Sequence, residues 1–309
     1  MAAGLSRECT LLSRIERAVS VPRGSQLRLG IGDDCAIFRP RGGTEDLLFT
    51  TDMLLEDVHF RRATHSAGDA GHKALARGLS DIAAMGGTPR FCLLSLAVPR
   101  WADQVWIDEF YRGFLRLANQ TGAPLAGGDL ALTDRLACDV TVCGAVPRGG
   151  ALLRSGARPG DGIYVSGRLG GSALGLATGK GRAWKRHLRP EPRLALGRFL
   201  RERLKATAAM DLSDGLSLDL TRMCIASRVT ATIERPPVFP GATPEQALHG
   251  GEDYELLFTL PPGSRPPARF DGVPLARIGQ IGKLSRSPAL VLLDGKPLAP
   301  SGFDHFQNS

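Results

Sequence analysis

The sequence predicts a protein of mixed helices and strands that is organised in two domains. Its 309 residues exceed the usual size of a single domain. Apolar runs with the spacing of strands alternate along the chain with apolar stripes that recur at helical spacing. Hydrophobic residues make up 43% of the chain, which is enough to form a substantial core.

The first half of the chain is expected to combine strands with two long helices. The helix over 69–85 is the clearest, because its apolar residues recur at helical spacing and form one stripe. Asp81 lies on another side of this helix and is free to face a site or water. The expected elements are helices over 6–19, 69–85 and 101–120 and strands near 35–38, 47–50, 91–98 and 136–146. The turn at 147–150 places a boundary there, so we expect domains 1–148 and 149–309.

The second half repeats the pattern of short strands followed by glycine-rich turns and helices. The turn over 167–171 resembles a phosphate-binding connection, although a plain connector is an equally good interpretation. The expected elements are strands over 163–166, 208–211 and 255–260, helices beginning near Ser172 and Leu216, a helix over 190–205, and a hairpin turn at Asp294-Gly295.

Aspartates follow glycine or hydroxyl residues at several predicted strand ends. They are Asp34, Asp52, Asp129, Asp211 and Asp214, and Asp81 joins them from a helix. Carboxylates that converge repel one another unless cations lie between them. Oxygen donors such as these, together with Thr50 and Thr51, favour Mg²⁺ or Ca²⁺ over zinc. The pattern therefore suggests metal-assisted phosphoryl transfer. Two plainer interpretations stay open: Gly-Asp turns, and a simple helix cap at Ser213 or Asp214.

Composition narrows the class of protein. Lys and Arg total 39 against 31 Asp and Glu, a net charge of +8. Nucleic-acid binding would explain this excess, but the basic residues are dispersed, so an arginine-rich surface or an anionic substrate is the better explanation. No apolar run has the length of a membrane span, and Met1 to Thr10 contain no signal-peptide core, so we expect a cytoplasmic protein. The scattered cysteines form no C-x-x-C pair and are expected to be reduced.

Seven motifs in order give the chain a resemblance to the thiamine-monophosphate kinase family, from Gly30 to Phe306. They are G-I-G-D-D-C-A, T-T-D-M followed by V-H-F, L-S-D-I-A-A-M-G, G-G-D, R-S-G-A-R-P-G-D, M-D-L-S-D-G and G-G-E-D-Y-E-L. The segment H-L-R-P-E-P-R and the ending G-F-D-H-F favour this family over related ATP-using enzymes such as aminoimidazole ribonucleotide synthetase.

The resemblance implies an α/β fold of the α+β type, like that of aminoimidazole ribonucleotide synthetase, with the N-terminal domain forming a homodimer through its sheet. It also implies ATP bound near several Mg²⁺ ions. Matched by motif, the metal-site candidates are Asp34, Thr50, Thr51, Asp52, Asp81, Asp129, Asp211 and Asp214, of which Asp34, Asp52 and Asp214 are the catalytic candidates. The nucleotide contacts are Tyr111, Gly128, Asp129, Arg154 and Ser213, and the contacts to thiamine monophosphate are His59, Glu252 and Phe303.

The reaction implied by the resemblance is ATP-dependent phosphorylation of thiamine monophosphate to thiamine diphosphate by in-line transfer. Its acceptor is a phosphate monoester whose second pKa is about 6, so no strong general base is required. His59 is then an orienting contact, or else an ordinary surface histidine. Glu252, at the start of a strand, is expected to meet it across the cleft between the domains. The alternatives are a sister ATP-dependent enzyme with another small substrate and a basic nucleic-acid-binding protein.

Overall fold

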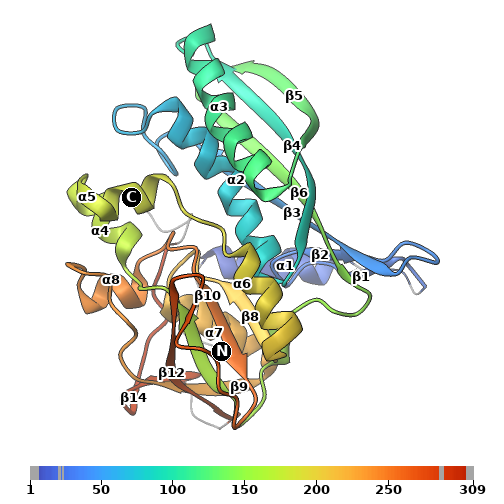
Figure 1. Ribbon diagram of the computed structural model, residues 1–309, viewed down its shortest axis with the longest axis vertical. Coiled ribbons are helices and arrows are strands. Elements are labelled where there is room, and N and C mark those ends of the chain that lie inside the picture. The colour runs from blue at the N-terminus through green and yellow to red at the C-terminus, as the bar shows by residue number, and fades with distance from the viewer. Residues whose placement is uncertain (1–6, 20–21, 23, 285–288, 304–309) are drawn as a thin grey trace.

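The protein is described here from a computed structural model that covers residues 7–19, 22, 24–284 and 289–303. Two β-sheets form separate layers, and a central helix lies between them (Figure 1). The closing residues Asp304, His305 and Phe306 of the last motif lie outside the described part of the chain, as does Ser6 at the start of the expected first helix.

The first sheet has six strands in the order β1-β2-β3-β6-β4-β5. Strands β4 and β5 pair in parallel, and the other pairs are antiparallel. The strands are β1 (Leu27–Leu29), β2 (Ala36–Phe38), β3 (Glu45–Leu55), β4 (Thr88–Pro99), β5 (Leu125–Thr133) and β6 (Ala137–Pro147). Each expected strand of this half is present.

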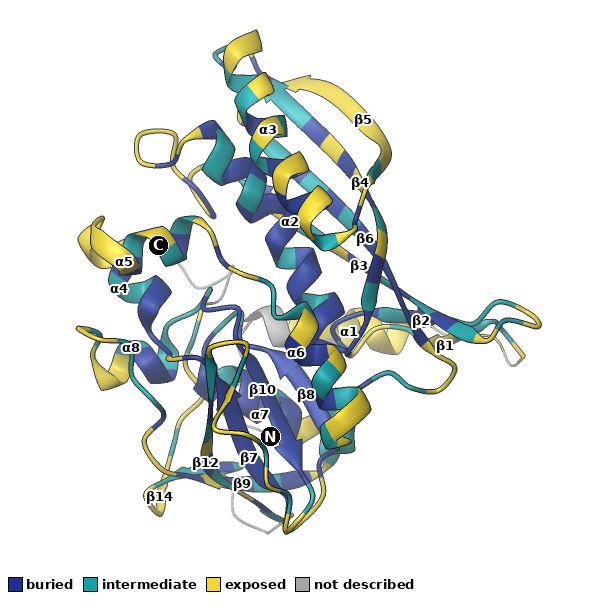
Figure 2. Ribbon diagram, viewed as in Figure 1, coloured by how far each residue is buried: buried dark blue, intermediate teal, exposed yellow. Residues whose placement is uncertain are grey.

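Helices α2 (Ala67–Ala84) and α3 (Gln104–Thr121) cover one face of this sheet, while α1 (Arg7–Ala18) lies beyond its end (Figure 1). The Ser66 hydroxyl caps α2 by accepting the Asp69 N–H. Buried aliphatic and aromatic side chains, among them Leu79 and Phe110, fill the space between helices and sheet. The opposite face carries no helix among the described residues and is largely exposed along β5 (Figure 2).

Two strands are longer than the sequence pattern predicts, and this moves some acids away from strand ends. Strand β3 runs on through Thr50, Thr51 and Asp52, so these residues lie in mid-strand and alternate between the two faces of the sheet. Asp129 likewise lies within β5. The expectation that both acids sit at strand ends was wrong, because polar residues on one face interrupt the apolar pattern without ending the ladder.

The second sheet has the order β14-β13-β9-β12-β7-β10-β8, with β11 paired to β12. Its strands are β7 (Gly162–Ser166), β8 (Ala208–Asp211), β9 (Val229–Ile233), β10 (Leu256–Leu260), β11 (Arg269–Phe270), β12 (Val273–Lys283), β13 (Val291–Leu293) and β14 (Lys296–Pro297). Asp294 and Gly295 join β13 to β14 with φ of 48° and 78°, as the expected hairpin requires.

The helices of the second half are short. They are α4 (Gly171–Thr178), α5 (Gly181–Leu188), α6 (Leu194–Phe199), α7 (Leu216–Ser227) and α8 (Pro244–His249), with a 3₁₀ turn η1 (Arg154–Gly156). The helix expected over 190–205 begins only at Leu194 and continues as a π-helical turn, η2 (Leu200–Leu204). Pro190 and Pro192 lie before its start. None of the described helices is both long and apolar enough to cross a membrane.

Helix α2 joins the two layers, because it packs on the first sheet and also contacts α5, α6 and β8. A side chain at Gly197 of α6 would collide with the carbonyl oxygen of Ala83, so glycine permits this close approach. The Ser80 hydroxyl of α2 donates to Asp211 at the end of β8 over 2.7 Å. One face of α2 is thereby fixed against the second sheet.

Candidate active site

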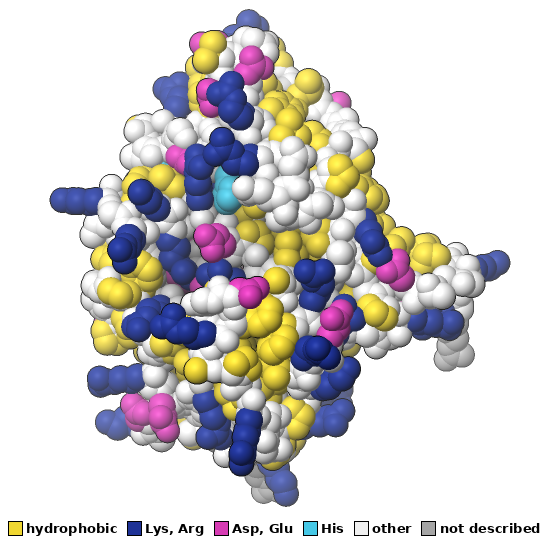
Figure 3. Space-filling view, in the orientation of Figure 1, with side chains coloured by type: hydrophobic (Ala, Val, Ile, Leu, Met, Phe, Trp, Pro, Cys, Tyr) yellow, Lys and Arg dark blue, Asp and Glu magenta, His cyan; other side chains and the backbone are white. Residues whose placement is uncertain are grey.

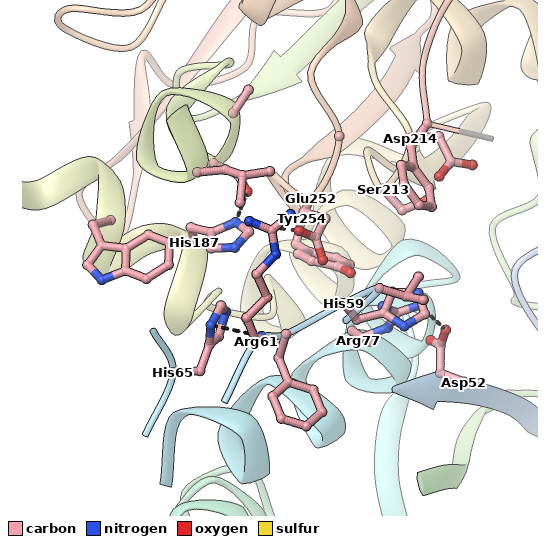
Figure 4. Close-up of a pocket in the computed structure, with 18 of the residues that line it drawn as sticks. Asp52, His59, Arg61, His65, Arg77, His187, Ser213, Asp214, Glu252 and Tyr254 are labelled. Carbon is pink, nitrogen blue, oxygen red and sulfur yellow. Dashed lines mark hydrogen bonds and ion pairs between the residues drawn. The ribbon is translucent and has the colours of Figure 1, made fainter. Parts of the chain in front are cut away.

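A cavity of about 620 Å³ lies where α2 and β3 meet the second half of the chain (Figure 4). Four aspartates, Asp52, Asp81, Asp211 and Asp214, line one part of it. His59, Glu252 and three aromatic side chains line another part. The residues that line the cavity include Asp52, His59, Arg61, His65, Arg77, Asp81, Trp184, His187, Asp211, Ser213, Asp214, Glu252, Tyr254 and Phe303.

Three carboxylates form an acidic cluster beside the cavity. Oxygens of Asp34, Asp81 and Asp211 all lie within 4.8 Å of one another. The Thr50 hydroxyl donates to Asp81 over 2.5 Å, and Ser80 donates to Asp211. Burial, and then the charges of neighbouring aspartates, raise the pKa of both Asp81 and Asp211. Three of the predicted metal-site acids are therefore brought together by three different elements.

This cluster fits a hard divalent cation such as Mg²⁺. The Oδ2 atom of Asp34 is buried and has no hydrogen-bond partner among the described residues, although its other oxygen pairs with Arg154. An acceptor of this kind, beside two mutually repelling carboxylates, is what a metal ion would satisfy. Asp33 lies next to it, where burial and the Asp34 charge raise its pKa to about 7.

Asp52 and Asp214 line the same cavity and are each paired with an arginine. Asp52 Oδ1 lies 3.1 Å from Arg77 Nη2, and burial raises the pKa of this carboxyl despite the arginine. Asp214 Oδ2 lies 2.5 Å from Arg222 Nη1. Both acids can thus be reached from the cavity while remaining held by a cation.

The start of α7 tests the capping role considered for Asp214. The helix begins at Leu216 with Gly215 as its cap, so Asp214 precedes the helix. The Asp219 carboxylate accepts the N–H groups of Asp214 and Gly215 from inside the helix. Capping by Ser213 or Asp214 was therefore the wrong interpretation, since Asp219 performs that role.

Seven predicted residues lie outside the cavity lining: Asp34, Thr50 and Arg154 belong to or contact the acidic cluster beside it, and the other four lie elsewhere. Thr51 projects from the exposed face of β3 and donates to Asp139 over 2.6 Å. Asp129 is exposed on β5, and the preceding Gly128 packs so closely on the backbone of Leu94 that no side chain fits. Tyr111 packs edge-on to Phe110 in α3. These four residues gather at the first sheet and α3, away from the acidic cluster.

At the other end of the cavity, Glu252 is held by a buried lysine. Lys73 Nζ lies 2.8 Å from Glu252 Oε1 and donates to the His59 carbonyl over 3.0 Å. Burial opposes ionisation of Glu252, but the neighbouring positive charges, that of Lys73 first, and the Lys73 hydrogen bond together outweigh burial and lower the pKa of Glu252 to about 2. The Lys73 bond brings His59 and Glu252 together as predicted.

The loop that carries Glu252 is strained. Glu252 and Tyr254 have φ of 64° and 49°, in the left-handed region that side chains rarely adopt. Glu252 thus lies before β10 (Leu256–Leu260) and does not begin a strand as expected. His59 is buried, and its Nδ1 accepts the Leu55 N–H, so the surface-histidine interpretation was wrong.

Aromatic rings form a wall beside Glu252. His187 stacks on Trp184 with centroids 5.1 Å apart, and His65 meets both rings edge-on. The Nδ1 atom of His187 lies 2.9 Å from Ser172 Oγ and 3.4 Å from Glu252 Oε2. Burial, and then the Lys73 charge, lower the pKa of both histidines to about 4, so they are neutral at pH 7.

Phe303 also lines the cavity, on the side of Asp214. The residue is 44% exposed, and its N–H donates to the Asp214 carbonyl over 3.2 Å. A ring on the cavity lining can stack on an aromatic ligand, and the role of Phe303 as a substrate contact stays a prediction.

Sequence reasoning missed several residues of this cavity: Arg61, His65, Lys73, Arg77, Trp184, His187 and Tyr254. One signal was available. Lys73, Arg77 and Asp81 recur at four-residue intervals, which places all three on one face of α2. The aromatic wall gave no comparable signal, because its members come from separate segments.

Comparisons with known proteins agree with this geometry. Residues 32–146 match the family model of the AIR synthase related protein, N-terminal domain. The thiamine-monophosphate kinase of Escherichia coli K12 is 40% identical over 96% of this chain and 98% of its own length. The thiamine-monophosphate kinase of Rhodopirellula baltica is 37% identical over 91% of this chain and 92% of its own length.

Solved structures show the same architecture. AaThiL complexed with AMPPCP and TMP is 31% identical, with a TM-score of 0.83 and coverage of 96% of both chains. The thiamine-monophosphate kinase of Stenotrophomonas maltophilia is 36% identical, with a TM-score of 0.76 over 94% of this chain and 96% of that one. Hydrogenase maturation protein HypE, at 19% identity and a TM-score of 0.67, shares the fold alone. The chain therefore has a mixed α/β fold with two sheets, of the AIR synthase type, and belongs to the thiamine-monophosphate kinase family.

Proposed function

We propose that this protein transfers a phosphoryl group from ATP to thiamine monophosphate, which yields thiamine diphosphate and ADP. One observation carries the proposal: a single cavity has an acidic cluster at one end and a carboxylate with an aromatic wall at the other. The first end suits a metal-bound nucleotide, and the second suits a cationic heteroaromatic ring. The thiamine-monophosphate kinases compared above are named for this activity.

The acidic cluster is the proposed Mg²⁺ site, built from Asp34, Asp81 and Asp211, with Asp52 and Asp214 nearby. Bound Mg²⁺ supplies charge neutralisation between the two anionic substrates. Among these acids, Asp34, Asp52 and Asp214 are the proposed catalytic residues. No general base is needed, because the acceptor oxygen is already ionised.

Glu252, His59 and Phe303 are the proposed contacts to thiamine monophosphate. Glu252 remains ionised beside Lys73 and so can attract the thiazolium cation or accept a bond from the pyrimidine amino group. The same charge would repel the phosphates of ATP. We therefore assign the end of the cavity at Glu252 to thiamine monophosphate and the end at the acidic cluster to ATP.

We infer that the nucleotide site is completed by a second copy of the chain. Arg154 and Ser213 lie beside the acids, but Gly128 and Asp129 lie on the exposed edge strand β5 (Figure 2) and Tyr111 lies on α3, away from the acids. Leu130 and Leu132 of β5 are each 66% exposed there, which is unusual for a face that meets only water. Light scattering should find a dimer, and Leu130→Asp with Leu132→Asp should give a folded monomer with weakened ATP binding. A monomeric wild-type protein would contradict this.

The activity itself is tested by incubating the protein with Mg-ATP and thiamine monophosphate and measuring thiamine diphosphate. A sister enzyme would instead turn over another small substrate. Nucleic-acid binding has little support, since basic side chains are scattered over the face in Figure 3 instead of forming one patch. We further propose that the chain divides into domains 1–148 and 149–309 and that the enzyme works in the cytoplasm, where ATP is available.

A further inference from the structure

Arg77 lines the cavity beside Asp52 and takes no part in the function proposed above. It follows Lys73 and precedes Asp81 by four residues each, so α2 directs these three charges to one side. Its side chain is 12% exposed, and it lines the cavity next to Asp52 and near His59 (Figure 4).

Most donors of the Arg77 guanidinium are unused. Arginine has five N–H donors. Of the contacts described for this side chain, one Nη2 bond joins it to Asp52, and its buried Nε has no hydrogen-bond partner among the described residues. Lys73, by contrast, is engaged by Glu252 and by the His59 carbonyl. A buried donor without a hydrogen-bond partner costs free energy, so an anionic group that enters the cavity would be bound here.

We propose that Arg77 binds the phosphate group of thiamine monophosphate and thereby selects the phosphorylated vitamin over thiamine. The inference rests on the proposed function. A planar guanidinium matches two oxygens of a phosphate group. Glu252 fixes the orientation of the ligand, because it accepts a hydrogen bond from the aminopyrimidine, the end of the vitamin farthest from the phosphate, and repels the phosphate. The phosphate then lies at Arg77, on the side of Asp52 and the acidic cluster, where the second phosphoryl group arrives.

The competing explanation is that Arg77 only neutralises Asp52. Binding measured without Mg²⁺ or nucleotide separates the two roles. We expect wild type to bind thiamine monophosphate more tightly than thiamine in calorimetry. In Arg77→Met, the dissociation constant for thiamine monophosphate should rise at least about tenfold, while that for thiamine stays the same, since a charge-assisted bond to phosphate is lost. The Michaelis constant for ATP should also stay the same.

Two further variants make the experiment decisive. In Arg77→Met with Asp52→Asn, the weak binding of thiamine monophosphate should persist, whereas recovery to the wild-type value would show that Arg77 only balances Asp52. Arg90→Met, which removes a half-exposed arginine paired with Glu45, is the matched control and should bind both ligands normally. If Arg77→Met does not fold, Arg77→Lys serves instead, because it keeps the charge but loses the planar fork.

The inference is overturned if the Arg77 variant keeps its affinity for thiamine monophosphate, or if it loses affinity for both ligands equally. Failure of the proposed function looks different. In that case, wild type itself would form no thiamine diphosphate from Mg-ATP and thiamine monophosphate, whatever the behaviour of Arg77.

Discussion

Lys73 and Glu252 form a buried ion pair that ties helix α2 to the strained loop before β10, with Nζ and Oε1 2.8 Å apart. The lysine side chain is fully buried, whereas the glutamate is 23% exposed and lines the cavity. The same lysine also binds the carbonyl of His59. One buried cation therefore positions two proposed substrate contacts that lie far apart in the sequence.

Glu252→Gln should impair both substrate binding and stability. The Michaelis constant for thiamine monophosphate should rise about tenfold or more while that for ATP changes little, because the lost charge faces only the acceptor. The free energy of unfolding should fall by about 1–3 kcal/mol, because Lys73 loses its counter-charge. The loss is limited because the glutamine amide can still accept a hydrogen bond from Lys73. Steady-state kinetics and urea denaturation measure the two effects.

The double variant Lys73→Met with Glu252→Gln is the control. It removes the buried cation together with its partner, so part of the lost stability should return. The Michaelis constant for thiamine monophosphate should remain high. A larger rise for ATP than for thiamine monophosphate would contradict the assignment of the two ends of the cavity.

Asp214→Asn should abolish activity while leaving the stability of the protein nearly unchanged. Asp214 does not cap α7, and its N–H is held by Asp219 whichever side chain it carries. The charge it loses is the one we assign to metal binding. Turnover and thermal melting, measured on the same preparation, test this.

Asp219→Asn is the matched comparison. It weakens the acceptor of two backbone N–H groups at the start of α7, so we expect a loss of about 1–2 kcal/mol of stability. A variant of Asp214 that melts much earlier yet retains normal turnover would show that the residue is structural.

The fold was largely predictable from the sequence, because apolar periodicity reports directly which face of an element is buried. The helix expected over 69–85 corresponds to α2, Ala67–Ala84. The errors lie where polar residues continue a strand, as at Thr51 in β3, and where local backbone bonds decide a boundary. At Asp214, a carboxylate five residues further on determines the helix start, which no local pattern reveals.

The site was only partly predictable. Motif order indicated the acids of the cluster, and three of them do converge. The wall of His65, Trp184 and His187 could not be predicted, because these residues meet only when the loop after β3 packs against α5. Spacing along a chain carries no information on such tertiary contacts.

Asp81→Asn should stabilise the protein without metal and reduce its response to Mg²⁺. Burial and neighbouring aspartates make ionised Asp81 unfavourable in the absence of a cation, and asparagine can still accept the Thr50 bond. In a chelator, the melting temperature of the variant should exceed that of wild type by a few degrees. Adding Mg²⁺ should raise the melting temperature of wild type more than that of the variant.

Asp108→Asn is the control for this experiment, because Asp108 is an exposed acid on α3, outside the cluster. It should respond to Mg²⁺ as wild type does. If Mg²⁺ raises the melting temperature of the Asp81 variant as much as that of wild type, Asp81 is not part of the metal site.

The last prediction concerns His65 and His187, whose pKa values burial lowers from 6.5 to about 4. Between these values the unfolded chain binds protons that the folded protein refuses, so both histidines reduce stability as pH falls from 6.5 to 4. His187→Phe retains the ring on Trp184 but cannot be protonated. Its stability relative to wild type, from urea denaturation across this range, should therefore improve steadily as pH falls. Titrating aspartates affect both proteins alike, and Glu252 stays ionised because its pKa is about 2. A difference that does not change with pH would show that His187 is not held neutral.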